Sequence, residues 1–402
     1  MDSRIVSNEP LHPEIGVLGL VPGCWGEMWQ VRQHILTRLA RYFHVVWCNK
    51  PRGWRDYWLP GANSTREPVP DKFGNMMIYT PGRWLPFLYR PVFVARLFEK
   101  KRLKQAIKKL RTKGCKHILL YIWRPEFGTA LDLVDFDRSF YHIDDEYSFS
   151  SIEKETSAEE AALIGRSDQV FIHSPALMEK KGNLNINTLY VSNGVDFHAY
   201  STPKPEPEDM KQIPHPRIGY TGIIKDQLDF ELLSTLVERH MEWSFVFVGP
   251  RRNIGSIENA LMNLEKKDNV FFLGGKPADE LPGYVQHFDV CSLCYKIDGY
   301  TKFIYPLKIN EYLATGRPVV GVPLPSIELF RDVVRIAQTS WEWSEAISVC
   351  LELKDNSEEA ITRRQEVARR SDWDNQAALI ARTMCDRAGI QYPIGELCNF
   401  QS

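Results

Sequence analysis

The chain contains 402 residues, with 50 Lys plus Arg against 51 Asp plus Glu, 44% apolar residues and 12% aromatic residues. This length predicts two domains, or three small ones, and the composition excludes fibrous and disordered proteins. The formal charge of −1 argues against a surface built entirely for nucleic acid, although it leaves room for a local basic patch.

The eight cysteines are spread thinly along the chain, without the spacing of a secreted disulfide framework, so reduced thiols are expected. The first residues, MDSRIVSNEP, contain acids and a proline where a signal peptide needs an apolar stretch. No uninterrupted apolar run approaches the roughly 18 residues of a membrane span. These features predict a cytoplasmic protein.

Short runs rich in Val, Ile, Phe and Tyr recur along the whole chain, separated by stretches long enough for a helix. Such runs suit strands buried on both faces, and their alternation with helical segments predicts parallel sheets covered by helices. The sequence therefore predicts an α/β domain in each half of the chain. The runs are 15–21, 44–50, 76–81, 117–123, 138–144, 169–174 and 187–193 in the first half, and 217–223, 244–250, 269–275, 289–295, 318–323 and 334–339 in the second.

A glycine turn containing Gly23 follows the first predicted strand, and residues 26–43 read as a helix. A glycine loop before a helix N-terminus offers backbone N–H groups and a positive dipole end to an anion such as a diphosphate. Gly23 is therefore a candidate binding residue. The alternative is an ordinary turn of an α/β domain, because the spacing is not that of the dinucleotide fingerprint.

Residues 96–116 carry ten Lys or Arg and a single Glu, and they follow the apolar, aromatic segment 82–95. Leu103, Ala106, Ile107 and Leu110 fall on one helical face, so the segment is a basic amphipathic helix. One interpretation is a solvated helix that covers the first sheet. The other is attachment to an anionic membrane surface. Nucleic-acid binding is less favoured, since no recognised binding module accompanies the patch.

Five prolines fall between residues 203 and 216, a composition that blocks helix interiors and sheet centres. We therefore predict a domain over 1–200, a linker over 201–216 and a second domain over 217–370. Open α/β sheets bind ligands beyond the carboxyl ends of their strands. Two such domains facing a central cleft can bind two substrates.

The segment 300–320 is the most informative part of the sequence. Pro306 opens a probable helix, and Lys308 and Glu311 lie one turn apart on it. The Glu311 carboxylate is suited to accept hydrogen bonds from two vicinal hydroxyls, and Lys302 or Lys308 to neutralise a phosphate. The alternative is an ordinary surface ion pair three residues apart.

The sequence PLKINEYLATGRPVVGVPLP, residues 306–325, resembles the nucleotide-sugar signature of the retaining glycosyltransferases of group 1, often called family 4. WQVRQHILTRLAR, FYHIDDEYS, SDQVFIHSPALMEKK, VSNGVDFHAYS and RIGYTGII resemble further family segments in the right order. The resemblance implies the GT-B fold, with two Rossmann-like domains facing a central cleft. It also implies that residues 371–402 form a helix that crosses back onto the first domain.

In that family the glutamate matching Glu311 binds the ribose of the donor nucleotide, and an earlier glutamate falls here on Phe303. Typical members also place an arginine after the glycine matching Gly222, where this chain has Ile223. The resemblance thus implies donor binding near Gly222 and Glu311, with the diphosphate held by basic substitutes. These are Lys225, Arg251, Lys302 and Lys308.

The family often places a His or Asp at the end of the strand over 138–144, to contact the transferred sugar or the acceptor. His142, Asp144 and Asp145 are the matching catalytic candidates. A helix N-cap or a salt bridge facing the linker is the alternative for the two acids. A metal site that includes Asp135 and Asp137 is discounted, because GT-B enzymes hold the diphosphate with backbone amides and basic side chains. We therefore expect no metal and no cofactor.

Cys291 and Cys294 form a C-x-x-C spacing inside an apolar strand without a second pair, and we predict that they are core residues. The sequence contains no H-E-x-x-H, G-x-S-x-G or P-loop motif.

The leading hypothesis is a retaining glycosyltransferase that uses a nucleotide-diphosphate sugar. Its acceptor would be a saccharide or a lipid-linked saccharide of cell-envelope polysaccharide or glycoconjugate synthesis. The basic helix would then bind the inner face of the membrane, and no nucleic-acid partner is expected. Because Phe303 and Ile223 replace family residues, a glycosyltransferase-like scaffolding subunit is the alternative. A nicotinamide oxidoreductase shares the strand pattern but lacks its fingerprint.

Overall fold

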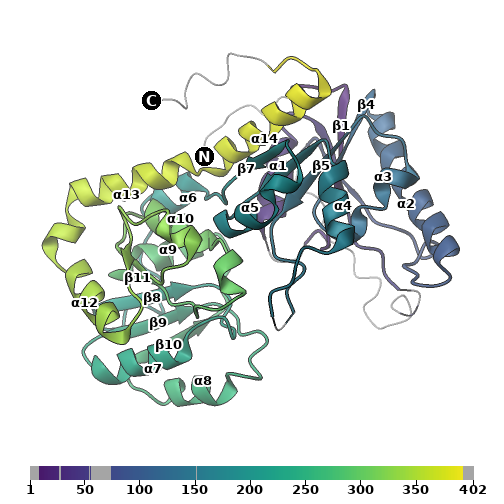
Figure 1. Ribbon diagram of the computed structural model, residues 1–402. Helices are drawn as coiled ribbons and strands as arrows, with labels where there is room; N and C mark the ends of the chain where they lie inside the picture. The colour runs from purple at the N-terminus through teal and green to yellow at the C-terminus, as the bar shows by residue number, and fades with distance from the viewer. Residues whose placement is uncertain (1–8, 27–28, 54, 56–73, 151, 393–402) are drawn as a thin grey trace.

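Two parallel sheets organise the chain, one in each half of the sequence (Figure 1). The computed structural model describes residues 9–26, 29–53, 55, 74–150 and 152–392. Glu27 and Met28 of the predicted helix, Cys398 and the rest of residues 393–402 lie outside the described part. Each apolar run that we predicted as a strand contains a β-strand in the structure, so the α/β prediction is confirmed for both halves.

The first sheet has seven strands in the order β3-β2-β1-β4-β5-β6-β7. Neighbouring strands pair in parallel throughout this sheet. The strands are β1 (Ile15–Leu20), β2 (His44–Cys48), β3 (Met76–Tyr79), β4 (His117–Ile122), β5 (Arg138–Ile143), β6 (Gln169–Ile172) and β7 (Thr188–Tyr190).

The second sheet has six strands in the order β10-β9-β8-β11-β12-β13, again all parallel. The strands are β8 (Arg217–Thr221), β9 (Ser244–Val248), β10 (Val270–Gly274), β11 (Val290–Leu293), β12 (Val319–Gly321) and β13 (Arg335–Ile336). Both sheets thus have the strand order of a Rossmann-like domain. In this order, successive strands are added on one side of the first strand and then on its other side.

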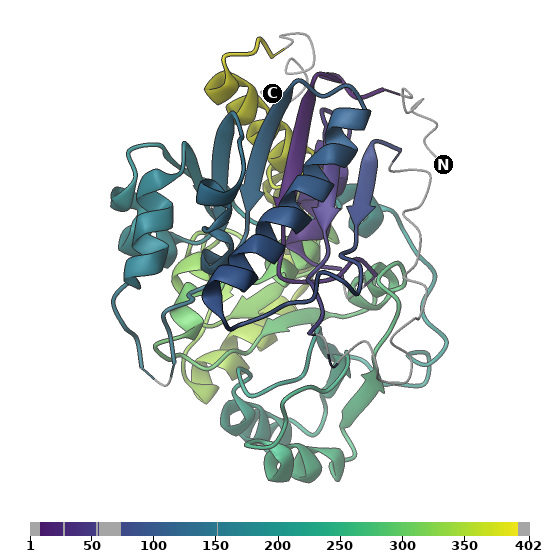
Figure 2. The same ribbon diagram turned by 90° about the vertical axis from the view of Figure 1, so that its right-hand side faces the viewer.

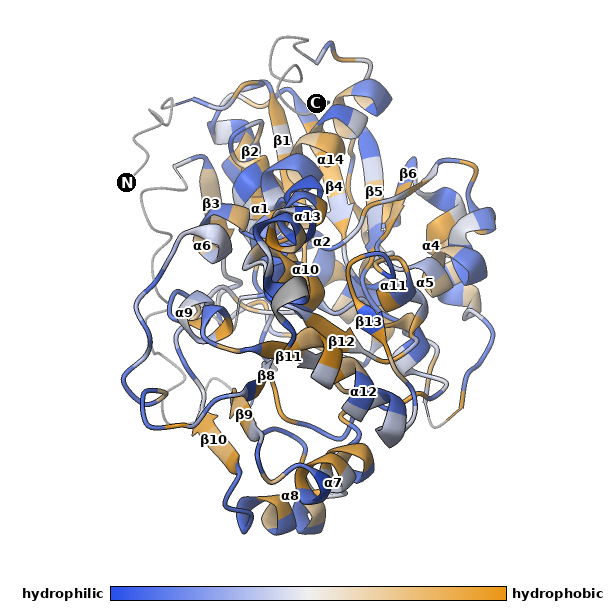
Figure 3. Cartoon of the chain, turned by 90° about the vertical axis from the view of Figure 1, so that its left-hand side faces the viewer, coloured by the Kyte–Doolittle hydropathy of each residue, from blue (hydrophilic) through white to orange (hydrophobic). Residues whose placement is uncertain are grey.

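Helices cover the first sheet on both faces, which explains why its central strands are apolar on both sides (Figure 3). On one face, α2 (Val92–Thr112) packs through Leu103, Ala106 and Leu110, next to α3, α4 and α5. α1 and α14 cover the other face. These helices are α1 (Val31–Leu39), α3 (Ala130–Leu133), α4 (Ala158–Arg166), α5 (Pro175–Lys181) and α14 (Trp373–Ala388), with short 3₁₀ turns η3 (Pro125–Phe127) and η4 (Gly182–Leu184).

The predicted helix over 26–43 is shorter in the structure, because α1 begins only at Val31. The side chain of Gln30 and that of Gln33 form a capping box at this start. The glycine turn with Gly23 is therefore separated from the helix N-terminus by a loop.

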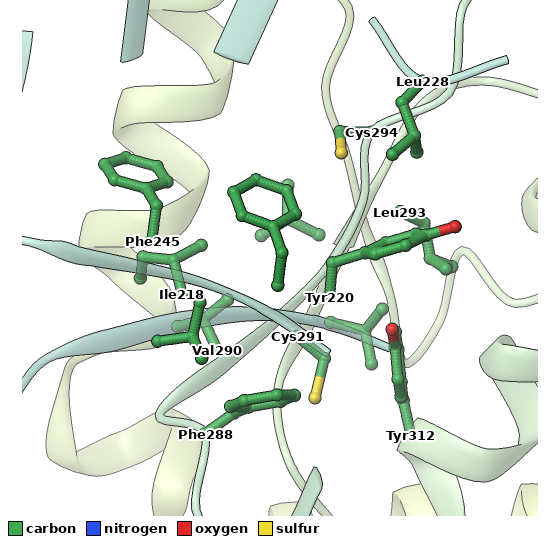
Figure 4. Packing of buried hydrophobic residues seen from close by; sticks show 14 of the residues in the cluster. Ile218, Tyr220, Leu228, Phe245, Phe288, Val290, Cys291, Leu293, Cys294 and Tyr312 are labelled. Atoms are coloured by element: carbon green, nitrogen blue, oxygen red, sulfur yellow. The ribbon is translucent and has the colours of Figure 1, made fainter. Parts of the chain in front are cut away.

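The second domain packs one large core around β8 and β11 (Figure 4). Cys291 and Cys294 lie in this core as free, fully buried thiols among Ile218, Tyr220 and Tyr312, which confirms their prediction as core residues. The surrounding helices are α6 (Phe197–Ser201), α7 (Phe230–Arg239), α8 (Glu258–Glu265), α9 (Leu281–Gln286), α10 (Leu307–Ala314), α11 (Pro325–Glu328), α12 (Ser340–Cys350) and α13 (Glu358–Arg370), with η5 (Thr301–Phe303) and η6 (Leu353–Asn356).

The chain crosses between the domains twice, and the two crossings are hydrogen bonded to each other. The backbone N–H of Val195 donates to the carbonyl of Ser371 at 3.0 Å, and that of Trp373 donates to the carbonyl of Val195 at 2.9 Å. Beyond the second crossing, α14 packs against α1 (Figure 1). The predicted return of the C-terminal helix to the first domain is therefore confirmed.

The proline-rich stretch that we predicted as a linker, 201–216, lies along the second domain. Met210 and Ile213 belong to the core of that domain. The buried guanidinium of Arg217 donates to the carbonyls of both residues at 2.8 Å. The passage between the domains lies earlier, at Val195, since prolines exclude regular helix and strand but do not prevent an irregular segment from packing.

Candidate functional site

The carboxyl edges of the two sheets meet, and most of the predicted site residues lie there. In each sheet the strand order reverses at one place, between β1 and β4 and between β8 and β11. Parallel α/β sheets bind ligands beyond their strands at such switch points. The hydroxyl of Tyr300, which follows β11, donates to Asp145, which follows β5, at 2.9 Å. The two switch points therefore face a common region.

Two glycines allow close backbone packing at the carboxyl edge of the second sheet. Gly222, directly after β8, has a φ of +128°, and Gly249, directly after β9, has a φ of +157°. A Cβ on Gly249 would lie 1.9 Å from the carbonyl oxygen of Gly222, and one on Gly222 would lie 2.3 Å from Cε of Lys308. Only glycine allows this close approach of backbone and lysine.

Lys308 and Lys225 place two positive charges beside Gly222. The Lys308 ammonium donates to the Tyr295 hydroxyl at 3.2 Å and lies 5.1 Å from the centre of the Tyr220 ring, so it does not form the surface ion pair with Glu311 that was the alternative. Burial lowers the pKa of Lys225, and the nearby charge of Lys308 lowers it further. The charge of Lys308 thus acts on Lys225, and two cations at this edge of the sheet favour an anion.

Glu311 lies one turn beyond Lys308 on α10 and is half-buried. Burial raises the pKa of its carboxyl group, while the Lys308 charge and a hydrogen bond from Tyr200 act in the opposite direction. The start of α10 is at the carboxyl edge, where the positive end of a helix dipole favours an anion. Lys308 and Glu311 thus present a cation and a hydrogen-bond acceptor on one helix face.

His142, at the end of β5, is 1% exposed. Its ring stacks on Trp123 at 4.2 Å, and its Nδ1 lies 2.7 Å from the Tyr121 hydroxyl. Burial lowers the pKa of His142 well below its ordinary value, and the neighbouring His173 and Arg32 lower it further. The imidazole is therefore neutral. Its Nε2 has no hydrogen-bond partner within the described residues.

Asp144 and Asp145 make separate contacts at the same edge. Asp144 pairs with Arg32 of α1 at 3.1 Å and accepts a short hydrogen bond from Tyr147. Asp145 accepts the bond from Tyr300 of the other domain. Asp144 therefore forms a salt bridge within the first domain, and Asp145 forms a polar contact between the domains.

Of the three further candidates, Gly23 follows β1 at the carboxyl edge of the first sheet, whereas Arg251 and Lys302 form ion pairs. Arg251 pairs with Glu265 and stacks on the ring of Phe272 at 5.0 Å. Lys302 pairs with Glu153 of the first domain at 2.5 Å. Gly23 lies half-buried in the loop between β1 and α1, on the first domain. The structure brings together Gly222, Lys225, Lys308 and Glu311 on one domain, and His142, Asp144 and Asp145 on the other.

Phe303, at the position of the family's earlier glutamate, has a packing role. It belongs to η5 of the second domain but lies, 3% exposed, in the core of the first. The ammonium of Lys180 lies 5.2 Å from the centre of its ring and that of Lys302 lies 4.9 Å away. A carboxylate would have to be buried among apolar side chains at this position.

Sequence reasoning missed Arg32, Arg124, Tyr200 and Tyr300. Arg124 directly follows β4, and its guanidinium lies 4.5 Å from the centre of the Tyr147 ring. Burial alone would lower the pKa of Arg124, but Tyr147, Asp144 and Asp145 raise it above its ordinary value. Its position at the end of the strand beside β1 was the available signal. The contacts of Tyr200 and Tyr300 depend on chain segments far apart in sequence.

Within the described ranges, no group of three or more His, Cys, Asp or Glu side chains is placed to hold a metal ion. Asp137 lies at the opposite end of β5 from Asp144, and it accepts a hydrogen bond from the backbone of Ile118 at 2.7 Å.

The described part of the chain also contains no helix that is long and apolar enough to span a membrane.

Comparison with known proteins relates the second domain to a family. Residues 216–352 match the family model described as glycosyl transferases group 1. A protein of Bacillus subtilis strain 168, named as the candidate teichuronic acid biosynthesis glycosyltransferase TuaH, is 29% identical over 245 residues. That match spans 58% of this chain and 59% of TuaH.

Solved structures resemble almost the whole chain. Sucrose-phosphate synthase from Thermosynechococcus elongatus has a TM-score of 0.67 at 15% identity, covering 93% of this chain and 98% of its own. Anabaena HepE in complex with UDP-glucose has a TM-score of 0.66 at 15% identity, covering 92% and 99%. An Escherichia coli trehalose-6-phosphate protein bound to UDP-2-fluoro glucose has a TM-score of 0.66 at 12% identity, covering 94% and 99%. These similarities show that the chain has the GT-B fold.

Proposed function

We propose that this protein is a glycosyltransferase that moves a sugar from a nucleotide-diphosphate donor to an acceptor hydroxyl with retention of configuration. One observation carries the proposal. Lys308 packs against Gly222 one helical turn from Glu311, and its charge acts on Lys225, all inside the segment that matches the group 1 family.

The donor would lie mainly on the second domain. Its diphosphate would contact Lys225, Lys308 and the start of α10, where positive charge and the helix dipole favour an anion. Glu311 would accept hydrogen bonds from the two hydroxyls of the ribose. The buried Tyr200 lies beside this carboxylate.

In the transfer step, the bond between the anomeric carbon and the diphosphate oxygen breaks, and its electron pair leaves with the diphosphate. The acceptor oxygen bonds to the same face of the sugar, and its proton passes to the departing phosphate oxygen. Lys225 and Lys308 would stabilise the negative charge that develops on the leaving group. His142, Asp144 and Asp145 would contact the sugar or the acceptor from the first domain.

The acceptor would be a saccharide or lipid-linked saccharide of cell-wall polysaccharide synthesis, supported by the similarity to TuaH. The described fold brings both domains to one region, and approach of the two substrates there excludes water that would hydrolyse the donor. UDP-sugars are the first donors to test, because several neighbours of the same fold were solved with UDP or a UDP-sugar.

Replacing Glu311 by Ala should weaken donor binding while the protein stays folded. Loss of hydrogen bonds to a charged acceptor predicts roughly 10- to 100-fold weaker affinity. Isothermal calorimetry with a panel of UDP-sugars measures this change, after thermal-shift screening has identified a stabilising donor.

Glu345→Ala is the matched control, because Glu345 is exposed on α12 and its loss changes the net charge equally. Unchanged donor affinity in Glu311→Ala would refute the ribose assignment. Release of free nucleoside diphosphate in the presence of acceptor distinguishes an enzyme from a scaffolding subunit, which would release none above background with any donor.

A further inference from the structure

Large apolar side chains gather on the surface around the start of α2. Five of them lie within 14 residues of each other and are 58–81% exposed. An isolated exposed apolar residue is normal, but a contiguous group marks a surface that binds another apolar phase. The residues are Trp84, Tyr89, Val92, Phe93 and Leu97.

A stripe of lysines continues from this apolar group along the outer face of α2. Phe93, Leu97, Lys101, Lys104 and Lys108 follow one another at intervals of three or four residues, so they share one face of the helix. The opposite face, with Leu103, Ala106 and Leu110, packs on the sheet. The stripe therefore points away from the protein, and Figure 2 shows α2 lying across the outside of the domain.

The lysines line an open hollow together with Leu97. The hollow is bordered by Leu97, Lys100, Lys101, Lys104, Gln105 and Lys108. Within the described part of the chain, the four lysines form no ion pair. The single acid of this region, Glu99, instead accepts a hydrogen bond from Thr129 at 2.6 Å. The hollow thus combines uncompensated positive charge with an apolar wall, which suits a lipid phosphate and the start of its acyl chain.

The apolar end of this surface lies at the same edge of the first sheet as the candidate site. All strands of the sheet are parallel, so the loop that follows β3 and leads to Val92 lies at the carboxyl edge. Arg102 holds this loop against α2 by donating to the carbonyls of Leu85 and Pro86, at 3.3 and 2.9 Å. The lysines then extend toward the opposite edge.

We propose that the loop before α2 and the outer face of α2 form a docking surface for an anionic lipid bilayer. Trp84, Tyr89 and Phe93 enter the interfacial region, where aromatic side chains are favoured, and the lysines contact lipid phosphates. This arrangement brings the carboxyl edge of the first sheet close to the membrane surface. Nucleic acid explains the lysines but not the aliphatic Val92 and Leu97, so a lipid surface accounts for the whole set.

Vesicle co-sedimentation of the full chain tests the proposal without any donor or acceptor. Vesicles with one third phosphatidylglycerol should bind the protein, and pure phosphatidylcholine vesicles should bind it much more weakly. Replacing Lys100, Lys101, Lys104 and Lys108 together by Gln should lower partitioning on the order of 100- to 1000-fold. The matched control replaces four exposed cations elsewhere, Lys266, Arg363, Arg370 and Arg382, and should bind like the unaltered protein.

A second variant separates the apolar contribution from the charge. Trp84→Ser with Phe93→Ser removes exposed side chains only, so the melting temperature should not change, and the binding that persists in 0.5 M salt should be lost. Three results would overturn the proposal. They are equal binding to neutral and anionic vesicles, unchanged binding after the lysine replacement, or an equal loss in the four-cation control.

Discussion

A group of buried charged side chains lies next to the segment that carries the candidate aspartates. The Lys181 side chain is fully buried, and its ammonium lies 2.9 Å from Glu160 and 3.2 Å from Glu146. Burial raises the pKa of Glu160, against the lowering effect of Lys181. Because Glu146 directly follows Asp145, its pairing with Lys181 fixes the end of the segment that presents both candidate aspartates.

Lys181→Met should destabilise the protein strongly, because it removes the cation that pairs with the buried Glu160 and one of the two cations that pair with Glu146. Breaking a buried pair in this way typically costs about 3–5 kcal/mol, and urea unfolding measures the loss. Lys154→Met, at an exposed lysine, is the control and should change stability by less than about 0.5 kcal/mol. A similar small effect for Lys181→Met would mean that the buried charges are not coupled.

At the residue scale, sequence patterns could predict contacts only between residues that lie close together along the chain. Lys308 and Glu311 are one turn apart on a helix with clear start and stop signals, so their common face could be predicted. The partners of Asp145 and Phe303 could not be predicted in this way. Asp145 contacts Tyr300, and Phe303 contacts the core of the first domain, only after the two domains assemble. Arg251 shows the same limit, since its pairing with Glu265 depends on α8.

The connection between β11 and α10 acts as a contact element between the domains. Tyr300 binds Asp145, Lys302 binds Glu153 and Phe303 enters the core of the first domain. The aromatic rings of Tyr300 and Phe149 also lie 5.3 Å apart. One short segment thus leads into α10 and makes contacts that hold the first domain beside the second.

Phe303→Glu should lower the free energy of unfolding by several kcal/mol without increasing transfer, because it puts a carboxylate in the apolar core of the first domain, where pairing with Lys180 or Lys302 offsets only part of the desolvation cost. Phe303→Leu keeps an apolar side chain there and should cost only about 1–2 kcal/mol. Thermal unfolding and nucleotide release measure the two effects. Higher turnover in Phe303→Glu would contradict the packing role and would indicate that the phenylalanine replaces a functional acid.

At the scale of elements, the strands were predictable because burial on both faces leaves a continuous apolar run. The helix over 26–43 was predicted too long, since the Gln30 capping box starts it later than the apolar pattern suggested. The proline-rich stretch showed correctly that no regular element forms there. Its packing onto the second domain depends on the buried Arg217, which no local pattern reveals.

The whole molecule is joined by two adjacent chain crossings and a returning helix. Val195 and residues 371–373 pair at the crossings, and Arg38 of α1 binds Asp374 at the start of α14 at 2.6 Å. Relative motion of the domains would therefore turn about this paired backbone, while α14 moves with the first domain.

Ile380→Asp should destabilise the first domain by more than about 4 kcal/mol, because Ile380 is fully buried against the first sheet. Leu379→Asp is the control on the same helix, since Leu379 is 39% exposed, and its effect should be small. Chemical unfolding of both variants measures the difference. Equal effects would mean that α14 contributes little to the first domain.

The position of α14 has a consequence for synthesis of the protein on the ribosome. The first domain is translated before the second, but Ile380, Met384 and Cys385, which complete one side of its core, are translated only after the second domain. Until then α1 alone covers its face of the first sheet and the part that α14 will cover stays exposed, while the intervening second domain already has its own core. The nascent first domain therefore presents apolar surface to chaperones throughout elongation, and its folding can be completed only after α14 has left the exit tunnel.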